Sequence, residues 1–538
     1  MVPRKLARGL ILLPLAAIFG APTPIPASPR DGSGDATTQY SLPQKLTWGP
    51  CPDRFASAPN VTCATYRVPL DWDHPTSTET ITLGMLRLPA RGDPSLRIGN
   101  LFINPGGPGA QATDVVAQLA AAAAAGRLGP GSAAELLEHF DAIGLDPRGV
   151  GLSTPVRCDA GLFNERVSLF PRTRREFDDL LAHNAALGES CRALSGRLVD
   201  FMDTASAARD HEAVRLALGG GKGGGGGEKA SFLGLSYGTQ LFSQYAELFP
   251  DGVRAMALDG ALQHSQAESS NLLIESAAYE TTLQKFFEWC DSANSSFDRA
   301  LPRDDGGDGG ARQVFIDVLA KARDAPIPAP GCDDGRATGC RSSVTEEEAR
   351  FNAQGLVLKT ASWPALGRAL LEARDDANAT LLSRAQPIAV GDDYEDSYLF
   401  GGTAVQCQDW THATASTWAG STELQILGAA FAPLTRGASQ SYRIEASCAG
   451  WPSPQRNPER PLSYAGDADV LLVNSVHDPS TSYVWAVGLG AELGERAVLL
   501  TRDGAGHTSW FLGGEATDVI NRYLVNLTLP EPGTVVNS

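Results

Sequence analysis

A serine flanked by glycines, in the G-L-S-Y-G motif of residues 234–238, is the first feature of the sequence that could carry out chemistry. An apolar run at residues 230–235 precedes Ser236, and a segment with helical spacing follows it as far as Pro250. A sharp turn between a strand and a helix would expose the hydroxyl, and the glycines would avoid clashes in such a turn. The motif therefore predicts that Ser236 is a nucleophile.

A serine hydroxyl needs a base to remove its proton and an acid to orient that base. In hydrolases built on a parallel sheet, the acid and then the base follow the serine along the chain. His507 directly follows the last expected strand, and Asp478 ends the strand before it. The segment between them is long enough for a crossover helix and a returning strand. We predict Asp478 as the acid and His507 as the base.

Other residues compete for both roles. Asp259 is the serious rival for the acid, because it ends the strand that follows the serine motif. His477 adjoins the proposed acid, and successive residues of a strand point to opposite faces. The remaining histidines lie in expected helices or loops remote from a strand end: His74, His139, His183, His211, His264 and His412.

Catalysis by a serine also needs donors for the oxyanion that develops on the substrate. One donor should be the backbone N–H of Tyr237, directly after the nucleophile, and the second should come from the loop after the third core strand. That loop is N-P-G-G-P-G, residues 104–109. We expect Gly107 to supply the second donor, with Gly106 as a close alternative.

Short apolar runs separated by helical patterns must position these residues, and they predict an α/β fold with a mostly parallel sheet flanked by helices. A helical segment inserted before the acid-bearing strand would cover the ligand-binding edge of the sheet as a cap. We expect a first part of the core at 28–262, the cap at 263–400, and a C-terminal region at 401–538 that completes the core. The expected strands are an antiparallel pair at 62–70 and 80–88, then 101–107, 140–149, 230–236, 253–261, 469–478 and 496–507.

The N-terminus predicts secretion, because residues 1–27 have a basic start, a short apolar run and a small-residue cleavage site. The nine cysteines show no metal-type spacing, so we expect disulfides and one thiol left over. The preferred pairs are Cys51 with Cys63, Cys158 with Cys191, and Cys407 with Cys448. Four sequons would carry glycans in a eukaryotic secretory route: Asn60, Asn294, Asn378 and Asn526.

The charge and the motifs also limit the partners. A formal net charge of −18 argues against nucleic acid or an anionic membrane surface, since both require a basic footprint. The glycine tract at 219–227 lacks the serine or threonine that follows the lysine of a phosphate-binding loop. We expect no cofactor, no metal and no stable membrane insertion. The oligomeric state stays open.

Taken together, the motifs resemble those of the tripeptidyl aminopeptidase-like α/β-hydrolases, secreted relatives of the prolyl aminopeptidases. The resemblance covers most of the mature chain, and its elements are collinear. They are VPLDWDHP (68–75), NPGGPG (104–109), GLDPRGVGLS (144–153), ARDHEAVRLALG (208–219), GLSYGT (234–239), ELFPDGVRAMALDGA (247–261), AVQCQDW (404–410), CAGWP (448–452), NSVHDPST (474–481) and GAGHTSW (504–510).

The resemblance implies an α/β-hydrolase fold with a TAP-like C-terminal domain that contributes both acid and base. It implies a serine peptidase that cleaves near a substrate's N-terminus, and Thr481 matches a threonine that supports the acid. A carboxylate of the cap would hold the substrate's ammonium group, and nothing in the sequence selects among Glu268, Glu275, Glu280 and Glu395. The alternative is an esterase or other acyl hydrolase with the same triad. A binding protein without catalytic activity is disfavoured by the intact triad candidates.

Overall fold

The computed structural model describes residues 46–129, 132–219, 228–292, 310–334, 339–385 and 398–537. The expected secretion signal at 1–27, the glycines of 220–227 and the candidate Glu395 lie outside these ranges. Across the described helices, none has both the length and the apolar character needed to cross a membrane.

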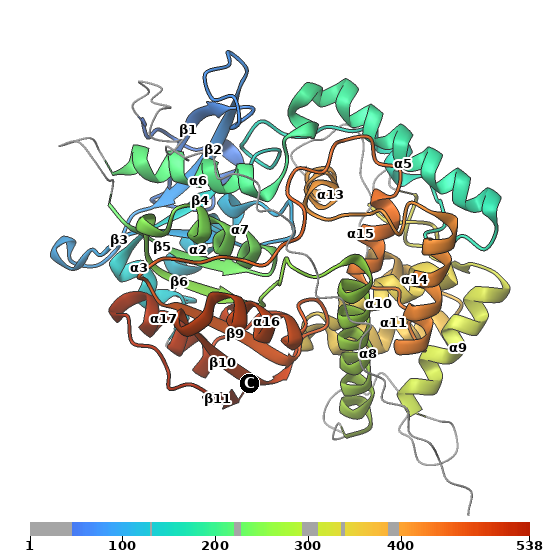
Figure 1. Cartoon of the computed structure of the whole chain (residues 1–538). Coiled ribbons are helices and arrows are strands. Elements are labelled where there is room, and N and C mark those ends of the chain that lie inside the picture. The colour runs from blue at the N-terminus through green and yellow to red at the C-terminus, as the bar shows by residue number, and fades with distance from the viewer. Residues whose placement is uncertain are drawn as a thin grey trace, which may run out of the picture.

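A nine-stranded sheet forms the centre of the molecule, in the order β1-β2-β4-β3-β5-β6-β9-β10-β11 (Figure 1). β1 and β2 pair antiparallel, and β2 is antiparallel to β4. From β4 onward all neighbouring strands are parallel. The mostly parallel sheet expected from the sequence is thereby confirmed. The bounds are β1 Thr62–Pro69, β2 Thr80–Leu88, β3 Gly99–Asn104, β4 Phe140–Leu145, β5 Ala230–Leu235, β6 Val253–Asp259, β9 Val470–His477, β10 Ala497–Ala505 and β11 Val535–Asn537.

Three short strands were not predicted, because they are too short to show a pattern of alternation. β11 adds the last strand of the sheet, and β7 (Ile327–Pro328) pairs with β8 (Ser343–Val344) outside it.

Helices cover both faces of the sheet, and this explains why every residue of β3 and of β5 is buried. One face packs against α6 (Thr204–Leu218), α7 (Tyr237–Leu248) and α16 (Tyr483–Leu493). The other packs against α2 (Ala112–Ala124), α3 (Ala134–His139) and α17 (Glu515–Asn526).

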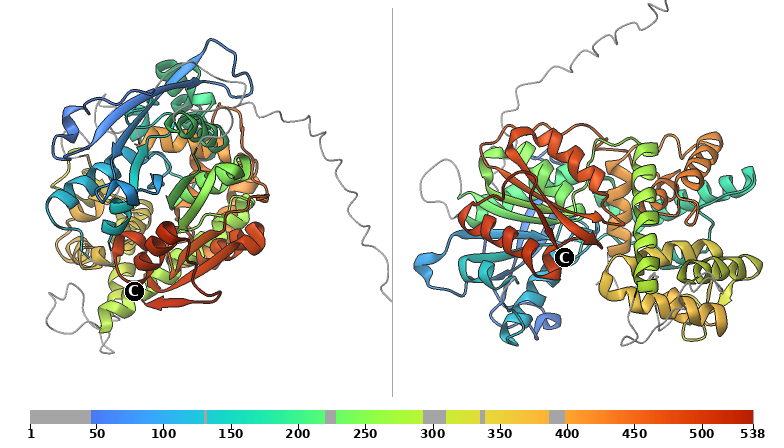
Figure 2. Two further views of the ribbon diagram at one scale, coloured as in Figure 1. Left: turned by 90° about the vertical axis from the view of Figure 1, so that its left-hand side faces the viewer. Right: turned by 90° about the horizontal axis from the view of Figure 1, so that it is seen from below.

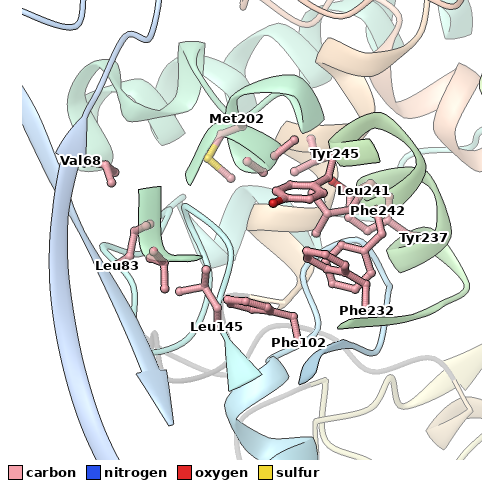
Figure 3. Packing of buried hydrophobic residues seen from close by; sticks show 14 of the residues in the cluster. Val68, Leu83, Phe102, Leu145, Met202, Phe232, Tyr237, Leu241, Phe242 and Tyr245 are labelled. Atoms are coloured by element: carbon pink, nitrogen blue, oxygen red, sulfur yellow. The ribbon is translucent and has the colours of Figure 1, made fainter. Parts of the chain in front are cut away.

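Aromatic rings fill the core next to the strand that carries the serine motif (Figure 3). The rings of Phe102 on β3 and Phe232 on β5 stack with centroids 5.6 Å apart. Tyr245 of α7 lies 4.5 Å from Phe232, centroid to centroid. These contacts fix α7 against β5, and therefore fix the turn between them.

A helical layer that begins after β6 lies beside the sheet (Figure 2). Its first helices have a hydrophobic core of their own. Three later helices, α13, α14 and α15, also belong to this layer, and α14 and α15 contact α8. The domain boundaries at 262/263 and 400/401 stay predictions. The helices of the layer are α8 Glu268–Ser292, α9 Gly310–Asp324, α10 Glu346–Val357, α11 Trp363–Asp375, α12 Thr380–Arg384, α13 Tyr398–Asp409, α14 Trp418–Phe431 and α15 Gln440–Cys448.

Two further helices lie between β4 and α6, namely α4 (Ala160–Asn164) and the long α5 (Arg174–Ser195). Thr173 and Glu176 form a capping box at the start of α5.

Disulfides join neighbouring elements, and the three pairs preferred from the sequence are confirmed: Cys51–Cys63, Cys158–Cys191 and Cys407–Cys448. A fourth bond links Cys332 to Cys340 in the helical layer. The thiol left over is Cys290, which is buried in α8. Burial raises the pKa of this thiol to about 12, so that it stays protonated and unreactive at neutral pH.

Candidate active site

Ser236 lies in a strained turn between β5 and α7, with φ 56° and ψ −128°. A Cβ on Gly234 would lie 2.4 Å from the carbonyl oxygen of Gly238, and a Cβ on Gly238 would lie 2.6 Å from the carbonyl oxygen of Asn104. Only glycine fits at these two positions, as expected for a turn this tight. Within the described part of the chain, the Ser236 hydroxyl makes no hydrogen bond, so it is available to a substrate and a base.

Asp478 and His507 are hydrogen-bonded to each other. The Nδ1 atom of His507 lies 2.9 Å from Oδ2 and 3.0 Å from Oδ1 of Asp478. A carboxylate accepts hydrogen bonds, so the proton of the neutral imidazole resides on Nδ1 and the lone pair is on Nε2. This is the tautomer that a general base for a serine needs.

Backbone and hydroxyl donors hold the buried Asp478 carboxylate. The amides of Ser480 and Thr481 donate to Oδ1 at 2.9 and 2.8 Å. The Thr481 hydroxyl donates to Oδ2 at 3.0 Å, and the Thr508 amide reaches Oδ2 at 3.3 Å. Burial alone would raise the pKa of Asp478, but the His507 charge and these donors outweigh it and lower that pKa.

The environment also shifts the pKa of His507. Burial favours the neutral ring, but the charge and hydrogen bond of Asp478 outweigh burial and raise the pKa of His507. Asp259 and Glu275 add to the increase. The surroundings of His507 therefore favour its protonated form.

The turn of Ser236 and the ring of His507 both lie next to the end of β6. The amide of Ser236 donates to the carbonyl oxygen of Asp259 at 2.9 Å. Gly260, the next residue, faces the base: a Cβ there would lie 3.3 Å from Cε1 of His507 and 3.0 Å from Oγ1 of Thr481. The structure thus brings the candidate nucleophile, acid and base to one edge of the sheet.

The rival acid, Asp259, makes no hydrogen bond with the imidazole. Its Oδ2 accepts the amides of Ser509 and Trp510 at 2.7 and 2.8 Å. Its position supports the choice of Asp478 as the acid.

The amides of the oxyanion loop differ in their partners. The Gly106 amide donates to Oδ1 of Asn104 at 2.9 Å, which occupies it. A Cβ on Gly106 would lie 2.9 Å from the amide nitrogen of Tyr237, so the loop lies directly against the start of α7. This arrangement favours Gly107 over Gly106 as the second oxyanion donor.

Three described glutamates proposed for the substrate's ammonium group are already engaged by backbone amides of residues 414–441. Each accepts two amides: Glu268 those of Thr414 and Ala415, Glu275 those of Gln440 and Ser441, and Glu280 those of Leu434 and Thr435. Burial raises the pKa of Glu275 to about 7. These contacts favour a structural role for the three glutamates within the helical layer.

Two residues of the helical layer that the sequence did not reveal, Gln354 and Leu358, contact the turns that carry Asp478 and His507. The amide of His507 donates to the carbonyl oxygen of Leu358 at 2.7 Å. Gln354 donates to the carbonyl oxygen of Pro479 and to Glu275, each at 2.9 Å. Backbone acceptors leave no mark in a sequence, so no motif could have identified these contacts.

One group in the described chain has the composition of a metal site: Glu268, His412 and Glu445. The Nδ1 atom of His412 lies 2.9 Å from Glu445 and its Nε2 atom lies 3.3 Å from the carbonyl oxygen of Gln406. Both ring nitrogens therefore face acceptors, and the pKa of His412 is raised because the bond to Glu445 outweighs burial. Burial raises the pKa of the partner Glu445 to about 7, and the hydrogen bonds of both His412 ring nitrogens favour a structural role over a ligand set.

Two family models match the chain. Residues 100–305 match the α/β-hydrolase fold, and residues 432–536 match the TAP-like protein family. A protein named carboxylesterase B from Mycobacterium tuberculosis is 30% identical over 98% of this chain and 96% of its own. The chain belongs to the α/β-hydrolase family. Within that family, it is a serine hydrolase with a TAP-like C-terminal region.

Other relatives of this α/β-hydrolase carry peptidase names. The serine protease Hip1 of M. tuberculosis is 28% identical over 91% of both chains. A tripeptidyl aminopeptidase of Streptomyces coelicolor is 27% identical over 86% of this chain and 80% of its own.

Proposed function

We propose that this serine hydrolase is an aminopeptidase that releases short units of two or three residues from peptide N-termini, with Ser236, Asp478 and His507 as its triad. The observation that carries the triad is the bond from His507 to the buried Asp478 beside a serine in a strained turn. Similarity to a tripeptidyl aminopeptidase supports the peptide substrate.

In the acylation step, Nε2 of His507 takes the proton of the Ser236 hydroxyl as its oxygen attacks the scissile carbonyl carbon. The carbonyl π electrons move to oxygen, and the amides of Tyr237 and Gly107 donate to the resulting oxyanion. When the oxyanion collapses, the carbon–nitrogen bond breaks and His507 gives its proton to the leaving amine. The acyl-enzyme ester remains on Ser236.

In the deacylation step, a water molecule replaces the amine. His507 removes a proton from water while the hydroxide attacks the acyl carbon, and the same proton returns to the Ser236 oxygen as the ester bond breaks. Asp478 stays ionised and stabilises the imidazolium in both steps. The free acid leaves, and the enzyme regains its initial protonation.

An esterase is the second candidate, because the 30% identical relative is named carboxylesterase B. The same triad hydrolyses either acyl group. The discriminating measurement compares a chromogenic tripeptide amide, its N-blocked form and an aryl ester. An aminopeptidase cleaves the free peptide much faster than the blocked one, whereas equal rates on the two peptides exclude an aminopeptidase.

We also propose that the enzyme is secreted, on the layout of residues 1–27 and on the four disulfides. The culture fluid of the producing cells should contain the protein with an N-terminus near residue 28. Retention of the full-length chain inside the cells would contradict export.

The triad is tested with a fluorophosphonate probe, which reacts with activated serines. The wild-type protein should be labelled on Ser236, and Ser236→Ala should not be labelled. Turnover of Ser236→Ala should fall by roughly 10⁴- to 10⁶-fold. Labelling that survives this substitution would assign the nucleophile to another residue.

A further inference from the structure

Asp259 contacts both halves of the candidate catalytic machinery through different atoms. Its backbone carbonyl accepts the amide of Ser236 at 2.9 Å. Its carboxylate accepts the amides of Ser509 and Trp510, just after the histidine, at 2.7 and 2.8 Å. One fully buried residue therefore links the turn of the nucleophile to the turn of the base.

Arg502 holds the same histidine turn by its carbonyl groups. Its guanidinium donates to the carbonyl oxygens of Ala505, Gly506 and Thr508 at 3.1, 2.8 and 3.3 Å. Its Nε donates to Oγ of Ser509 at 2.9 Å. The side chain is 2% exposed. A buried arginine that binds three carbonyls of one turn fixes that turn, because guanidinium donors have a rigid geometry.

We propose that Asp259 and Arg502 are positioning residues for the base. The Asp259 carboxylate accepts amides of the turn that carries His507, and the Arg502 guanidinium donates to carbonyl oxygens of the same turn. The backbone carbonyl of Asp259 holds the amide of Ser236 beside this turn. This inference rests on the proposed triad, and it assigns to Asp259 a role distinct from that of the acid.

The charge of Asp259 affects the pKa of His507, and a residue that only supported the fold would not have this effect. The charged groups around His507 are Asp478 at the end of β9, Asp259 at the end of β6, Glu275 on α8 and Arg502 on β10. Asp259 raises the pKa of His507, although burial and Asp478 have larger effects. Loss of the Asp259 charge should lower the pKa of His507, and activity should then persist to lower pH.

The chain offers a matched control in Asp146. It directly follows β4, is fully buried, and accepts the amides of Thr113 and Leu152 at 2.9 and 2.8 Å. It resembles Asp259 in burial and in its amide partners, but the largest effects on the pKa of His507 come from burial, Asp478, Asp259 and Glu275. The variant Asp146→Asn therefore shows how the loss of a buried carboxylate away from the base changes the labelling rate and the melting temperature.

The experiment measures the rate of fluorophosphonate labelling of the full-length protein from pH 4 to pH 9. Phosphonylation of the serine needs a neutral histidine, so the acid midpoint of this profile reports the pKa of His507 without any assumption about the natural substrate. The proteins compared are the wild type, Asp259→Asn, Asp146→Asn and Arg502→Lys, with melting temperatures recorded for each.

We expect Asp259→Asn to move the acid midpoint to lower pH, and Asp146→Asn to leave it unchanged. Arg502→Lys keeps the charge but loses the fork geometry, so its maximal labelling rate should fall by at least about tenfold with the midpoint retained. An Asp259→Asn midpoint equal to that of the wild type, or an equal shift in Asp146→Asn, would overturn the role of Asp259.

Two outcomes keep this test separate from the test of the triad. If Asp259→Asn does not fold, Arg502→Lys decides, and a wild-type labelling rate in that variant overturns the proposal. If the wild-type protein is not labelled on Ser236 at all, the triad itself is wrong, and the positioning role is rejected with it.

Discussion

At the scale of single residues, the site depends on how a buried carboxylate is kept ionised. Asp478 has a fully buried side chain, yet its pKa is lowered, because His507 and backbone amides together outweigh burial. A carboxylate in this state orients the imidazole and stabilises its protonated form. The reactivity expected of Ser236 therefore depends on amide donors in the turns of Asp478 and His507, which are distant from Ser236 in the sequence.

The substitution Asp478→Asn should remove the carboxylate that orients the imidazole of His507. The new side chain would offer an amide group to Nδ1 and would favour the wrong tautomer of His507, so kcat should fall by roughly 10³- to 10⁴-fold with little change in KM. Steady-state kinetics on an activated ester or peptide amide provides the measurement. Asp146→Asn serves as the control, and a similar loss of kcat in both variants would contradict a specific role for Asp478.

The pH dependence follows from the raised pKa of His507. The base must be neutral, so kcat/KM of the wild type should be low in acid and should rise through a midpoint above the ordinary histidine value of about 6.5. A pH profile of kcat/KM from pH 4 to pH 9 measures this midpoint. A midpoint below pH 6 would contradict the dominance of Asp478 over burial.

Residue types and their order selected Ser236, Asp478 and His507 as candidates, because a triad needs particular side chains at strand ends. The same reasoning left Asp259 as a rival, since a sequence does not say which aspartate faces the imidazole. It missed Arg502, although a lone arginine in the apolar run of β10 was a visible signal. The reason is that its partners are backbone carbonyls, which every residue possesses.

At the scale of elements, the turn between β5 and α7 sets the position of Ser236. The close approach of Gly234 to the carbonyl of Gly238, and of Gly238 to Asn104, packs the turn against the oxyanion loop. The serine and the donors for the oxyanion are therefore held by one contact between two loops. The sequence predicted both loops but could not determine how closely they approach.

An alanine at Gly238 should test this contact. Its Cβ would lie 2.6 Å from the carbonyl oxygen of Asn104, so the oxyanion loop must shift, and the free energy of unfolding should fall by about 1–3 kcal/mol. The labelling rate of Ser236 should fall as well. Gly129→Ala, at an exposed position with no atom within 4 Å of the new Cβ, is the control and should behave as the wild type.

At the scale of the whole molecule, a sheet and a helical layer are joined by distant parts of the chain. The periodicity of the sequence predicted the main strands and a mostly parallel sheet, because strands buried on both faces are long apolar runs. It could not place α14 and α15 against α8, because that contact depends on side chains far apart in the sequence. The disulfide Cys407–Cys448 fixes this arrangement by joining α13 to α15.

Removal of this disulfide should destabilise the folded protein. The bond closes a loop with a sequence separation of 41 residues, so a Cys407→Ala and Cys448→Ala double variant should lose about 3–4 kcal/mol of unfolding free energy. Denaturant unfolding followed by circular dichroism measures the loss. An unchanged midpoint would mean that packing of α15 alone holds the helical layer together.

The contact between Leu358 and the histidine has a consequence for how substrates enter. The carbonyl oxygen of Leu358, just after α10, accepts the amide of His507. The side chain of Gln354, on α10, donates to the carbonyl oxygen of Pro479, directly after the candidate acid. If the helical layer swung away as a rigid lid, it would pull on the very turns that carry base and acid. A substrate whose entry required displacement of α10 would therefore disturb the placement of the candidate base and acid.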